Sequence, residues 1–432
     1  MTLTERLARV RTLRHAVAAD AGALARAAAR PGASEADVMV SEVLPFLEAC
    51  RFLESQAPRL LTDRTPAGSR PLWLFGTRLT VRRVPLGRVL VVGPANYPLL
   101  LPGVQALQAW VAGNTVFVKP APGCAAPMHA LADRLDDRFV VLGDTAEAAR
   151  ARIEQGVEHV VLTGSATTGR AVLAELAPRL VGATMELSGR DALIVLPGAD
   201  LALAARAIAF GLRFNAGRTC IAPRRIIVVG DVLDRLRPLL GEALGEATVP
   251  VPPALMAEVF AILPTGTAIG RADLATADAM PPMVLEAAAD SAWTSRDLFA
   301  PLASLHVVPD EAATIALAND GPYALGAAVF GPHAGAMAVA RALRAGCVLV
   351  NDVVAPTADP RLPFGGTGDS GFGTTRGAEG LLAMTRPQAI VARTGGGSRH
   401  LTTLDAGSAP LVARLIRLAH GRAADRISAI RR

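Results

Sequence analysis

Three side chains that could act together in acyl chemistry stand at Asn96, Glu186 and Cys220. A cysteine thiolate is an effective nucleophile, although a lone cysteine is more often a small buried residue. Glu186 lies in the apolar segment M-E-L-S-G, where a carboxylate needs a partner, a capping role or a catalytic purpose. Asn96 lies in G-P-A-N-Y-P, where it could shape a turn or donate to an anion. Taken singly, each residue leaves both interpretations open.

A second group of residues could bind a nucleotide. Lys119 is the only lysine among 44 Lys and Arg residues, which indicates a site that needs a compact ammonium group. Gly164, Ser165 and Gly169 lie in L-T-G-S-A-T-T-G, whose backbone N–H groups could hold a phosphate where an expected helix begins. The segment lacks the lysine of a P-loop, and the first strand–helix turn lacks G-x-G-x-x-G. By itself this glycine turn is a weak signal.

Six motifs follow one another in a fixed order: G-P-x-N-Y-P, V-F-V-K-P, T-G-S-x-x-x-G, E-L-x-G, F-N-x-G-x-x-C and P-F-G-G-x-G-x-S-G-x-G. Together they resemble the aldehyde dehydrogenase superfamily, from about residue 5 to residue 392. The interval of 34 residues from Glu186 to Cys220 matches the family's spacing between general base and nucleophile. The C-I-A-P at Cys220 and the glycine-rich ending look most like the class 3-like branch, which acts on fatty and aromatic aldehydes.

The resemblance implies a role for each of these residues. The Cys220 thiolate would attack the aldehyde, while the Asn96 amide and the Cys220 backbone N–H would hold the oxyanion. Hydride transfer to NAD or NADP would leave a thioester, which water activated by Glu186 would hydrolyse. Lys119 would bind the adenosine ribose, Ser165 the pyrophosphate and Asp297 the nicotinamide ribose. The full cofactor-binding set is Pro94, Lys119, Gly164, Ser165, Gly169, Leu187, Asp297 and Phe299, with Phe299 supporting the nicotinamide ring.

The chain also departs from the family pattern. Pro122 replaces the usual Glu three residues after the ribose-binding lysine, which removes a repulsion against a 2′-phosphate and leaves both NAD and NADP open. Asp297 is one methylene shorter than the usual Glu. Ala95 replaces a common aromatic residue and would leave a roomier entrance. The stretch from about 231 to 296 is shorter than is typical, so part of the outer shell of the catalytic domain is expected to be trimmed.

An alternation of strands and helices would position these residues. Helices are expected within 3–62, followed by an exposed strand pair at 72–84. Buried strands are then expected at 88–93, 115–119, 139–142, 159–163, 192–195, 225–229 and 347–351. Helices are expected between them at 99–112, 126–135, 146–155, 200–213 and 334–345, and a further helix is expected to begin at 164. This rhythm predicts an α/β fold with a mostly parallel sheet.

The resemblance divides the expected fold into four parts. Residues 1–68 and 85–187 would form a Rossmann-type NAD(P)-binding domain, and residues 188–385 an α/β catalytic domain. Residues 69–84 and 386–394 would form a small β oligomerisation arm, whose strand pairs with one near 387–393 or with a neighbouring subunit. Because such arms build dimers or tetramers in the family, a homodimer or homotetramer is expected. Residues 395–432 would form a linker and a basic C-terminal helix.

Composition narrows the class of protein. The net charge of +6 comes from scattered Arg residues without an aromatic-interleaved stripe, which argues against nucleic-acid binding. The cysteines Cys50, Cys124, Cys220 and Cys347 stand far apart, without disulfide or zinc spacing, and fit a reducing cytoplasm. Neither a metal site nor a signal peptide nor a transmembrane segment is expected. The chain is therefore interpreted as a cytoplasmic enzyme.

Three alternatives stay open. A CoA-acylating aldehyde dehydrogenase would release the acyl group to CoA, although Glu186 argues against it. A catalytically silent nucleotide-binding scaffold is suggested by Pro122, Asp297 and the short segment. Residues 409–432 carry apolar and Arg residues in amphipathic order, so this helix could contact an anionic membrane surface or pack within an oligomer.

Overall fold

The computed structural model describes residues 1–68, 74, 76–286, 292–393, 395, 401 and 403–422. Its contacts divide the chain into two units. The first contains Met1–Thr62 and Arg83–Pro387, and the second contains Asp63–Arg82 and Gln388–Arg432. All the catalytic and cofactor-binding residues expected from the sequence belong to the first unit.

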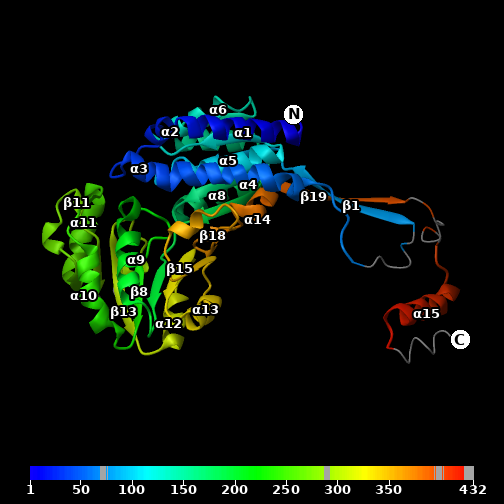
Figure 1. The fold of residues 1–432 in the computed structure, drawn as a ribbon. Coiled ribbons are helices and arrows are strands. Elements are labelled where there is room, and N and C mark those ends of the chain that lie inside the picture. Colours follow the sequence, from blue (N-terminus) through cyan, green and yellow to red (C-terminus); the bar gives the residue numbers. More distant parts are fainter. Residues whose placement is uncertain are drawn as a thin grey trace. The chain divides into compact units, whose positions relative to one another are not determined.

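The first unit begins with helices, as the sequence predicts. They are α1 (Leu3–Ala19), α2 (Ala21–Ala27), α3 (Glu35–Val38), a π-helical turn (Met39–Val43) and α4 (Leu44–Leu61). A capping box between Thr2 and Glu5 starts α1. Helices α1 and α4 pack on each other and on α5 (Leu100–Ala112), which is buried along its whole length (Figure 1). This apolar helical layer is one wall of the cavity described below.

A six-stranded sheet in the order β18-β6-β5-β2-β3-β4 follows. Its strands are β2 (Arg88–Val92), β3 (Thr115–Lys119), β4 (Phe139–Val141), β5 (His159–Gly164), β6 (Gly182–Leu187) and β18 (Gly371–Phe372), with α6 (Ala126–Ala132), α7 (Ala146–Glu154) and α8 (Ala166–Leu176) as further helices. All strand pairs are parallel except β18 with β6. The strand order reverses between β2 and β5, and ligands of open α/β sheets bind beyond the carboxyl ends of strands at such a point.

A second sheet has seven strands in the order β10-β12-β13-β8-β7-β15-β16. They are β7 (Ala192–Val195), β8 (Arg225–Val229), β10 (Thr267–Ile269), β12 (Met283–Glu286), β13 (Leu302–Val308), β15 (Gly326–Phe330) and β16 (Cys347–Val350). Its helices are α9 (Leu201–Arg213), α10 (Val232–Leu244), α11 (Pro253–Ile262), α12 (Glu311–Ala318) and α13 (His333–Ala342). Only β10 runs antiparallel to its neighbour.

Short elements complete the first unit. Strand β9 (Val249–Pro250) pairs with β11 (Ala279–Met280), and β14 (Tyr323–Ala324) pairs with β17 (Thr367–Gly368). Helix α14 (Gly377–Ala383) follows the glycine-rich segment. The two sheets confirm the predicted α/β class, and every strand expected from 88 to 351 is present within a residue or two of its expected bounds.

The second unit is small. Strand β1 (Thr77–Pro85) pairs with β19 (Thr385–Arg393), both extending a few residues into the first unit, and helix α15 spans Ala409–His420. Of the strand pair expected within 72–84, residues 77–84 form one strand, and its partner β19 agrees with the expected pairing of the arm with a strand near 387–393. The remaining predictions for the arm and the tail lie outside the described residues, at 69–73, 75, 394, 396–400, 402 and 423–432.

Candidate active site

Cys220 lies in a loop whose backbone is held in an unusual conformation. Between α9 and β8 the chain passes through Asn215, Ala216 and Gly217, whose φ angles are 52°, 54° and 72°. A Cβ atom at Gly217 would lie 2.5 Å from the carbonyl carbon of Ala300, so this position requires glycine. Left-handed backbone at non-glycine residues costs about 1 kcal/mol or more each and persists where surrounding contacts fix it. The loop therefore presents Cys220 in a fixed position.

Asn96 is tied to that same loop. It follows β2, and its side-chain amide donates to the carbonyl oxygen of Arg218 at 2.7 Å. In return, the Asn215 amide donates to the carbonyl oxygen of Asn96 at 2.9 Å. The Tyr97 hydroxyl lies 2.7 Å from the Thr219 hydroxyl. These three contacts join residues about 120 positions apart in the sequence. One N–H of the Asn96 amide is used, and the other is left to donate to a second acceptor.

Glu186 lies near the end of β6 and is 2% exposed. Its Oε2 atom accepts from the Thr375 hydroxyl at 2.7 Å and from the Gln105 amide at 3.5 Å. Its Oε1 atom is buried and has no partner among the described residues. Burial raises the pKa of Glu186, while the charge of Arg376 and the two hydrogen bonds oppose that rise. A buried carboxylate with a raised pKa and one unused oxygen is suited to accept a proton.

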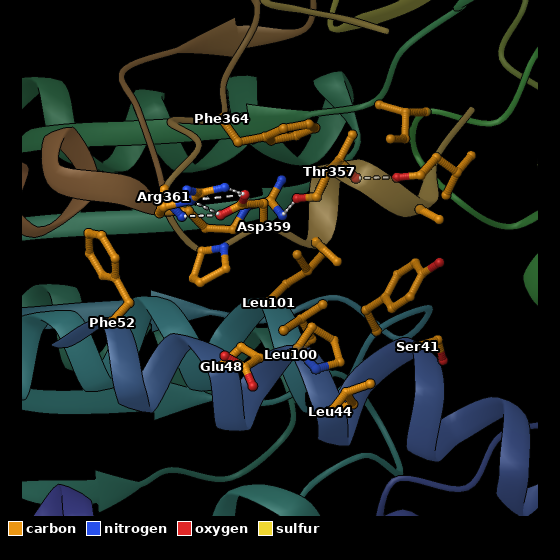
Figure 2. A pocket seen from close by; sticks show the side chains of 18 of the residues that line it. Ser41, Leu44, Glu48, Phe52, Leu100, Leu101, Thr357, Asp359, Arg361 and Phe364 are labelled. Carbon is orange, nitrogen blue, oxygen red and sulfur yellow. Dashed lines mark hydrogen bonds and ion pairs between the residues drawn. The ribbon is translucent and has the colours of Figure 1, made fainter. Parts of the chain in front are cut away.

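A large cavity contains both Cys220 and Glu186. Its volume is about 1060 Å³, and Figure 2 shows side chains of α4 and α5 facing the segment 357–364 across it. The apolar part of its lining includes Leu44, Phe52, Leu100, Leu101, Phe214 and Phe364. The charged residues Glu48, Arg51, Asp359 and Arg361 also line it, and the side chains of Arg51 and Arg361 are 65% and 79% exposed. The cavity could thus hold a long or bulky apolar molecule with one end beside the thiol.

Charged groups near Cys220 affect the pKa of its thiol. Burial raises the pKa of the Cys220 thiol, and the carboxylates of Glu186, Asp191 and Asp297 raise it further. The guanidinium of Arg376 acts in the opposite direction. Arg376 was not identified from the sequence, and neither were Gln105 and Thr375, although Gln105 is nine residues after Asn96 and T-T-R directly follows the last motif.

Lys119 ends β3 and is 9% exposed. Burial lowers the pKa of its ammonium group, and the charge of Asp144 opposes this effect. Asp144 follows β4, and its carboxylate accepts from the backbone N–H of Gly123 at 2.7 Å. A carboxylate therefore lies beside the residue that follows Pro122, although position 122 itself carries none.

Gly164 and Ser165 join β5 to α8. The Ser165 hydroxyl caps the helix by accepting from the Thr168 N–H at 3.1 Å. A Cβ at Gly169 would lie 3.0 Å from the Leu187 side chain, so glycine lets this helix pack closely on the end of β6. Pro94 follows the neighbouring strand β2. The carboxyl ends of β2, β5 and β6 are thus surrounded by Pro94, Gly164, Ser165, Gly169 and Leu187. The N-terminus of α8 at this place favours an anion.

Asp297 has a different environment from the one expected of a ribose ligand. Its Oδ1 atom forms an ion pair with the Nε atom of Arg224 at 3.2 Å, and both side chains are almost fully buried. Its Oδ2 atom is buried without a partner in the described part of the chain. The Arg224 guanidinium also lies 5.3 Å from the centre of the Phe299 ring. To contact a ribose, Asp297 would therefore have to give up its ion pair with Arg224 or bind the ribose and Arg224 at the same time.

The described residues contain neither a membrane-spanning helix nor a metal-binding cluster. No helix there is long and apolar enough to cross a membrane. No group of His, Cys, Asp and Glu side chains there is arranged to hold a metal ion. All four cysteines are free thiols.

Comparison with known proteins gives matches over most of the chain. The model of the aldehyde dehydrogenase family matches residues 1–259 and 256–390. A 4,4′-diapolycopene aldehyde oxidase from a Methylomonas species is 30% identical over 379 residues, which cover 82% of this chain and 71% of that protein. A succinate-semialdehyde dehydrogenase (NADP(+)) from Deinococcus radiodurans is 34% identical over 340 residues, 72% of this chain and 70% of that protein. The substrate-bound structure of Staphylococcus aureus AldH shares the fold, with a TM-score of 0.83, 23% identity and 95% coverage of both chains.

Proposed function

The chain belongs to the aldehyde dehydrogenase family, and from that premise we propose that it oxidises an aldehyde to the carboxylic acid through a thioester on Cys220. One observation carries the proposal. Cys220 and Glu186 line the same cavity, while the Asn96 amide is bonded to the loop that presents Cys220. Nucleophile, base and oxyanion donor thus occupy one site, as covalent acyl chemistry requires.

Cys220 begins the reaction as a thiolate. Its sulfur attacks the carbonyl carbon, and the carbonyl oxygen becomes an oxyanion in the resulting thiohemiacetal. The unused N–H of Asn96 and the backbone N–H of Cys220 donate to this oxygen, and each such donor contributes about 3 kcal/mol to transition-state stabilisation. Because contacts with Arg218 and Asn215 already fix Asn96, little reorganisation accompanies the change in charge.

Glu186 acts in the second half of the reaction. Its free Oε1 atom takes a proton from water, and the hydroxide attacks the thioester carbon. The carboxylic acid leaves and the Cys220 thiolate is restored. The hydrogen bonds from Thr375 and Gln105 hold the other oxygen, Oε2, and so orient the carboxylate. Transfer to CoA would not need this water-activating carboxylate, which supports hydrolysis as the releasing step.

The cofactor is NAD or NADP, which accepts the hydride from the thiohemiacetal when bound. The first sheet is proposed as the cofactor-binding domain and the second as the catalytic domain. The residues fit the cofactor: the α8 N-terminus with Ser165 suits a pyrophosphate, and Gly169 lets this helix pack closely against Leu187 at the end of β6. Lys119 would hold the adenosine ribose. Pro94, Gly164, Leu187, Asp297 and Phe299 complete the proposed binding set, with Asp297 shared between Arg224 and the nicotinamide ribose.

The proposed substrate is a long-chain aliphatic or an aromatic aldehyde. A cavity of about 1060 Å³ is at the upper end of the range for small-molecule sites, and its lining as a whole is predominantly apolar. One relative is named for a diapolycopene aldehyde and another for succinate semialdehyde, so the relatives' names include both a large apolar and a small charged substrate. The size and lining of this cavity favour the apolar class. The names of the relatives do not single out the class 3-like branch, so the assignment to that branch stays a prediction.

Two further proposals concern the second unit. The β1–β19 pair would join copies of the chain into a homodimer or homotetramer, because Ile390 and Val391 on β19 are exposed. Helix α15 exposes Leu411, Leu415 and Ile416 by more than half, with Arg residues between them. Such a helix could lie on an anionic membrane surface, with its apolar side chains in the interface.

A panel of aliphatic and aromatic aldehydes, with succinate semialdehyde for comparison, tests the function. Each is mixed with NAD or NADP without CoA, and NAD(P)H is followed by absorbance. Formation of NAD(P)H and of the free acid, with kcat/KM rising with chain length, would support the proposal. Turnover only with CoA would indicate the acylating reaction, and no turnover with any aldehyde would indicate a silent scaffold.

A further inference from the structure

Arg376 occupies a backbone position that normally requires glycine. It directly precedes α14, with φ 59° and ψ 177°. This conformation costs a non-glycine residue on the order of 1–3 kcal/mol and persists only where the surroundings determine it. The residue is only 9% exposed, so the strained backbone carries an arginine into the interior. A strained, buried arginine beside a cavity suggests a role for its charge.

Two contacts fix the guanidinium group. Its Nη1 atom donates to the carbonyl oxygen of Thr357 at 2.6 Å, and its carbon lies 4.2 Å from the centre of the Phe364 ring. Its Nε atom is buried and has no partner within the described part of the chain. None of the ion pairs found among the described residues includes Arg376. A buried cation without a paired carboxylate is costly, so its charge should serve another purpose.

The groups around it indicate that purpose. Arg376 lines the same cavity as Cys220 and Glu186, and its neighbour Thr375 holds the Glu186 carboxylate. The other charged groups that influence Cys220 are the carboxylates of Glu186, Asp191 and Asp297, all of which raise the pKa of the thiol. The positive charge of Arg376 lowers the pKa of both Cys220 and Glu186 against the effect of burial.

We propose that Arg376 is a positioning residue whose buried positive charge keeps the Cys220 thiolate and the Glu186 carboxylate ionised in one desolvated cavity. This inference rests on the proposed function, because it acts through the nucleophile and the base. Two negative charges close together in an apolar site repel each other, and a fixed cation offsets that repulsion. The strained backbone and the contacts with Thr357 and Phe364 keep the cation in place.

Recognition of a carboxylate on the substrate is the main competing role for Arg376. The geometry disfavours it, since Nη1 is engaged by Thr357, Nε is enclosed and one face of the guanidinium lies on Phe364. A side-on bidentate grip on a substrate carboxylate needs free N–H groups on Nε and on one Nη atom, and the enclosed Nε blocks this arrangement, which leaves only an end-on contact. The two roles predict different kinetic effects, and the experiment below separates them.

The test compares Arg376→Gln and Arg376→Met, which are neutral, with Arg376→Lys, which keeps the charge. Arg361→Gln is the matched control, because Arg361 lines the same cavity but is 79% exposed in its side chain and paired with Asp359. The rate of carbamidomethylation of Cys220 by iodoacetamide is measured from pH 5 to 10 without aldehyde or cofactor, by mass spectrometry of the Cys220 peptide. Melting temperatures identify any variant that fails to fold.

We expect the neutral variants to react at least tenfold more slowly at neutral pH, with the midpoint of the pH profile shifted upward by one pH unit or more. Arg376→Lys should restore most of the wild-type profile, and Arg361→Gln should leave it unchanged. The proposal is overturned if a folded neutral variant keeps the wild-type profile, or if Lys and Gln shift it equally. It is also overturned if the only change is a higher KM for succinate semialdehyde.

Failure of the proposed function gives a different result. In that case wild-type Cys220 would show no preferential alkylation over Cys124 and Cys347, and no aldehyde would be oxidised. Failure of the Arg376 inference alone leaves a reactive Cys220 and full turnover, with a pH profile that does not depend on residue 376.

Discussion

The side-chain amide of Asn96 donates a 2.7 Å hydrogen bond to the carbonyl oxygen of Arg218, two residues before Cys220. Asn96 follows a strand of the first sheet and Cys220 precedes a strand of the second, so this bond joins the two sheets at the reacting atoms. A second hydrogen bond, from the Asn215 amide to the Asn96 carbonyl oxygen, joins the same two segments. The oxyanion donor and the nucleophile are thus positioned relative to each other before substrate binds.

Replacing Asn96 tests this relationship. Asn96→Ala removes the oxyanion donor and the bond to Arg218, and it should lower kcat by about 10²–10³-fold. Asn215→Ala removes the hydrogen bond to the Asn96 carbonyl and the acceptor of the Arg30 Nε–H, but no oxyanion donor, so it should have a much smaller effect on kcat. Steady-state kinetics with one aldehyde provide the measurement. A kcat for Asn96→Ala within threefold of wild type would contradict the role of the amide.

Glu186→Gln tests the hydrolytic step. The variant should still give a burst of one NAD(P)H per active site in rapid mixing, followed by a steady state slower by about 10²-fold or more. The neutral form of Glu186 cannot accept a proton, so wild-type deacylation should be lost as pH falls through its pKa. Because burial raises that pKa, the loss should occur above the ordinary value for Glu, and the Gln variant should not show it. Equal loss of burst and steady state would instead indicate a role in activating Cys220.

Cofactor selection should depend on the surroundings of Lys119. Pro122→Glu adds a carboxylate that repels a 2′-phosphate and should raise the preference for NAD over NADP. Asp144→Asn removes the negative charge beside Gly123 and should shift the preference toward NADP. The ratio of kcat/KM for the two cofactors is the readout. A wild-type preference for NAD above about a thousandfold, equal to about 4 kcal/mol, would refute weak discrimination.

Sedimentation with anionic vesicles tests the membrane proposal for α15. The full chain should bind at low salt and detach at high salt, because Arg residues alternate with exposed Leu411, Leu415 and Ile416. Deletion of 409–432 should abolish binding without changing kcat. The idea fails if the deleted protein binds as well as the full chain, or if neither binds.

Seven strands of the two sheets could be predicted because they are short, largely apolar runs, such as Arg225–Val229. Strand β6 was not predicted, since Glu186 and Thr184 interrupt its apolar pattern and their partners come from elsewhere. Strand β13 was missed for the same reason, because Ser304 and His306 alternate with apolar residues in it. A buried polar residue obscures a strand from sequence reading, and it is common at functional sites.

The proposed nucleophile, base and oxyanion donor could be inferred from ordered motifs, but the residues that contact them could not. Thr375 lies 189 residues from Glu186, and Asp297 lies 73 residues from Arg224. Neither pairing has a local pattern, because the contacts exist only after the sheets have assembled. The ion pair of Asp297 with Arg224 therefore could not be foreseen from the D-L-F-A-P motif alone.

Replacing each cysteine in turn measures the central claim most directly. Cys220→Ser should abolish NAD(P)H formation and acyl-enzyme accumulation, because serine lacks an acidic thiol. Cys124→Ser and Cys347→Ser, at partly exposed positions, should retain most of the wild-type kcat, and so should Cys50→Ser, whose position in the helical core affects stability rather than turnover. Substantial aldehyde oxidation by folded Cys220→Ser would contradict the account.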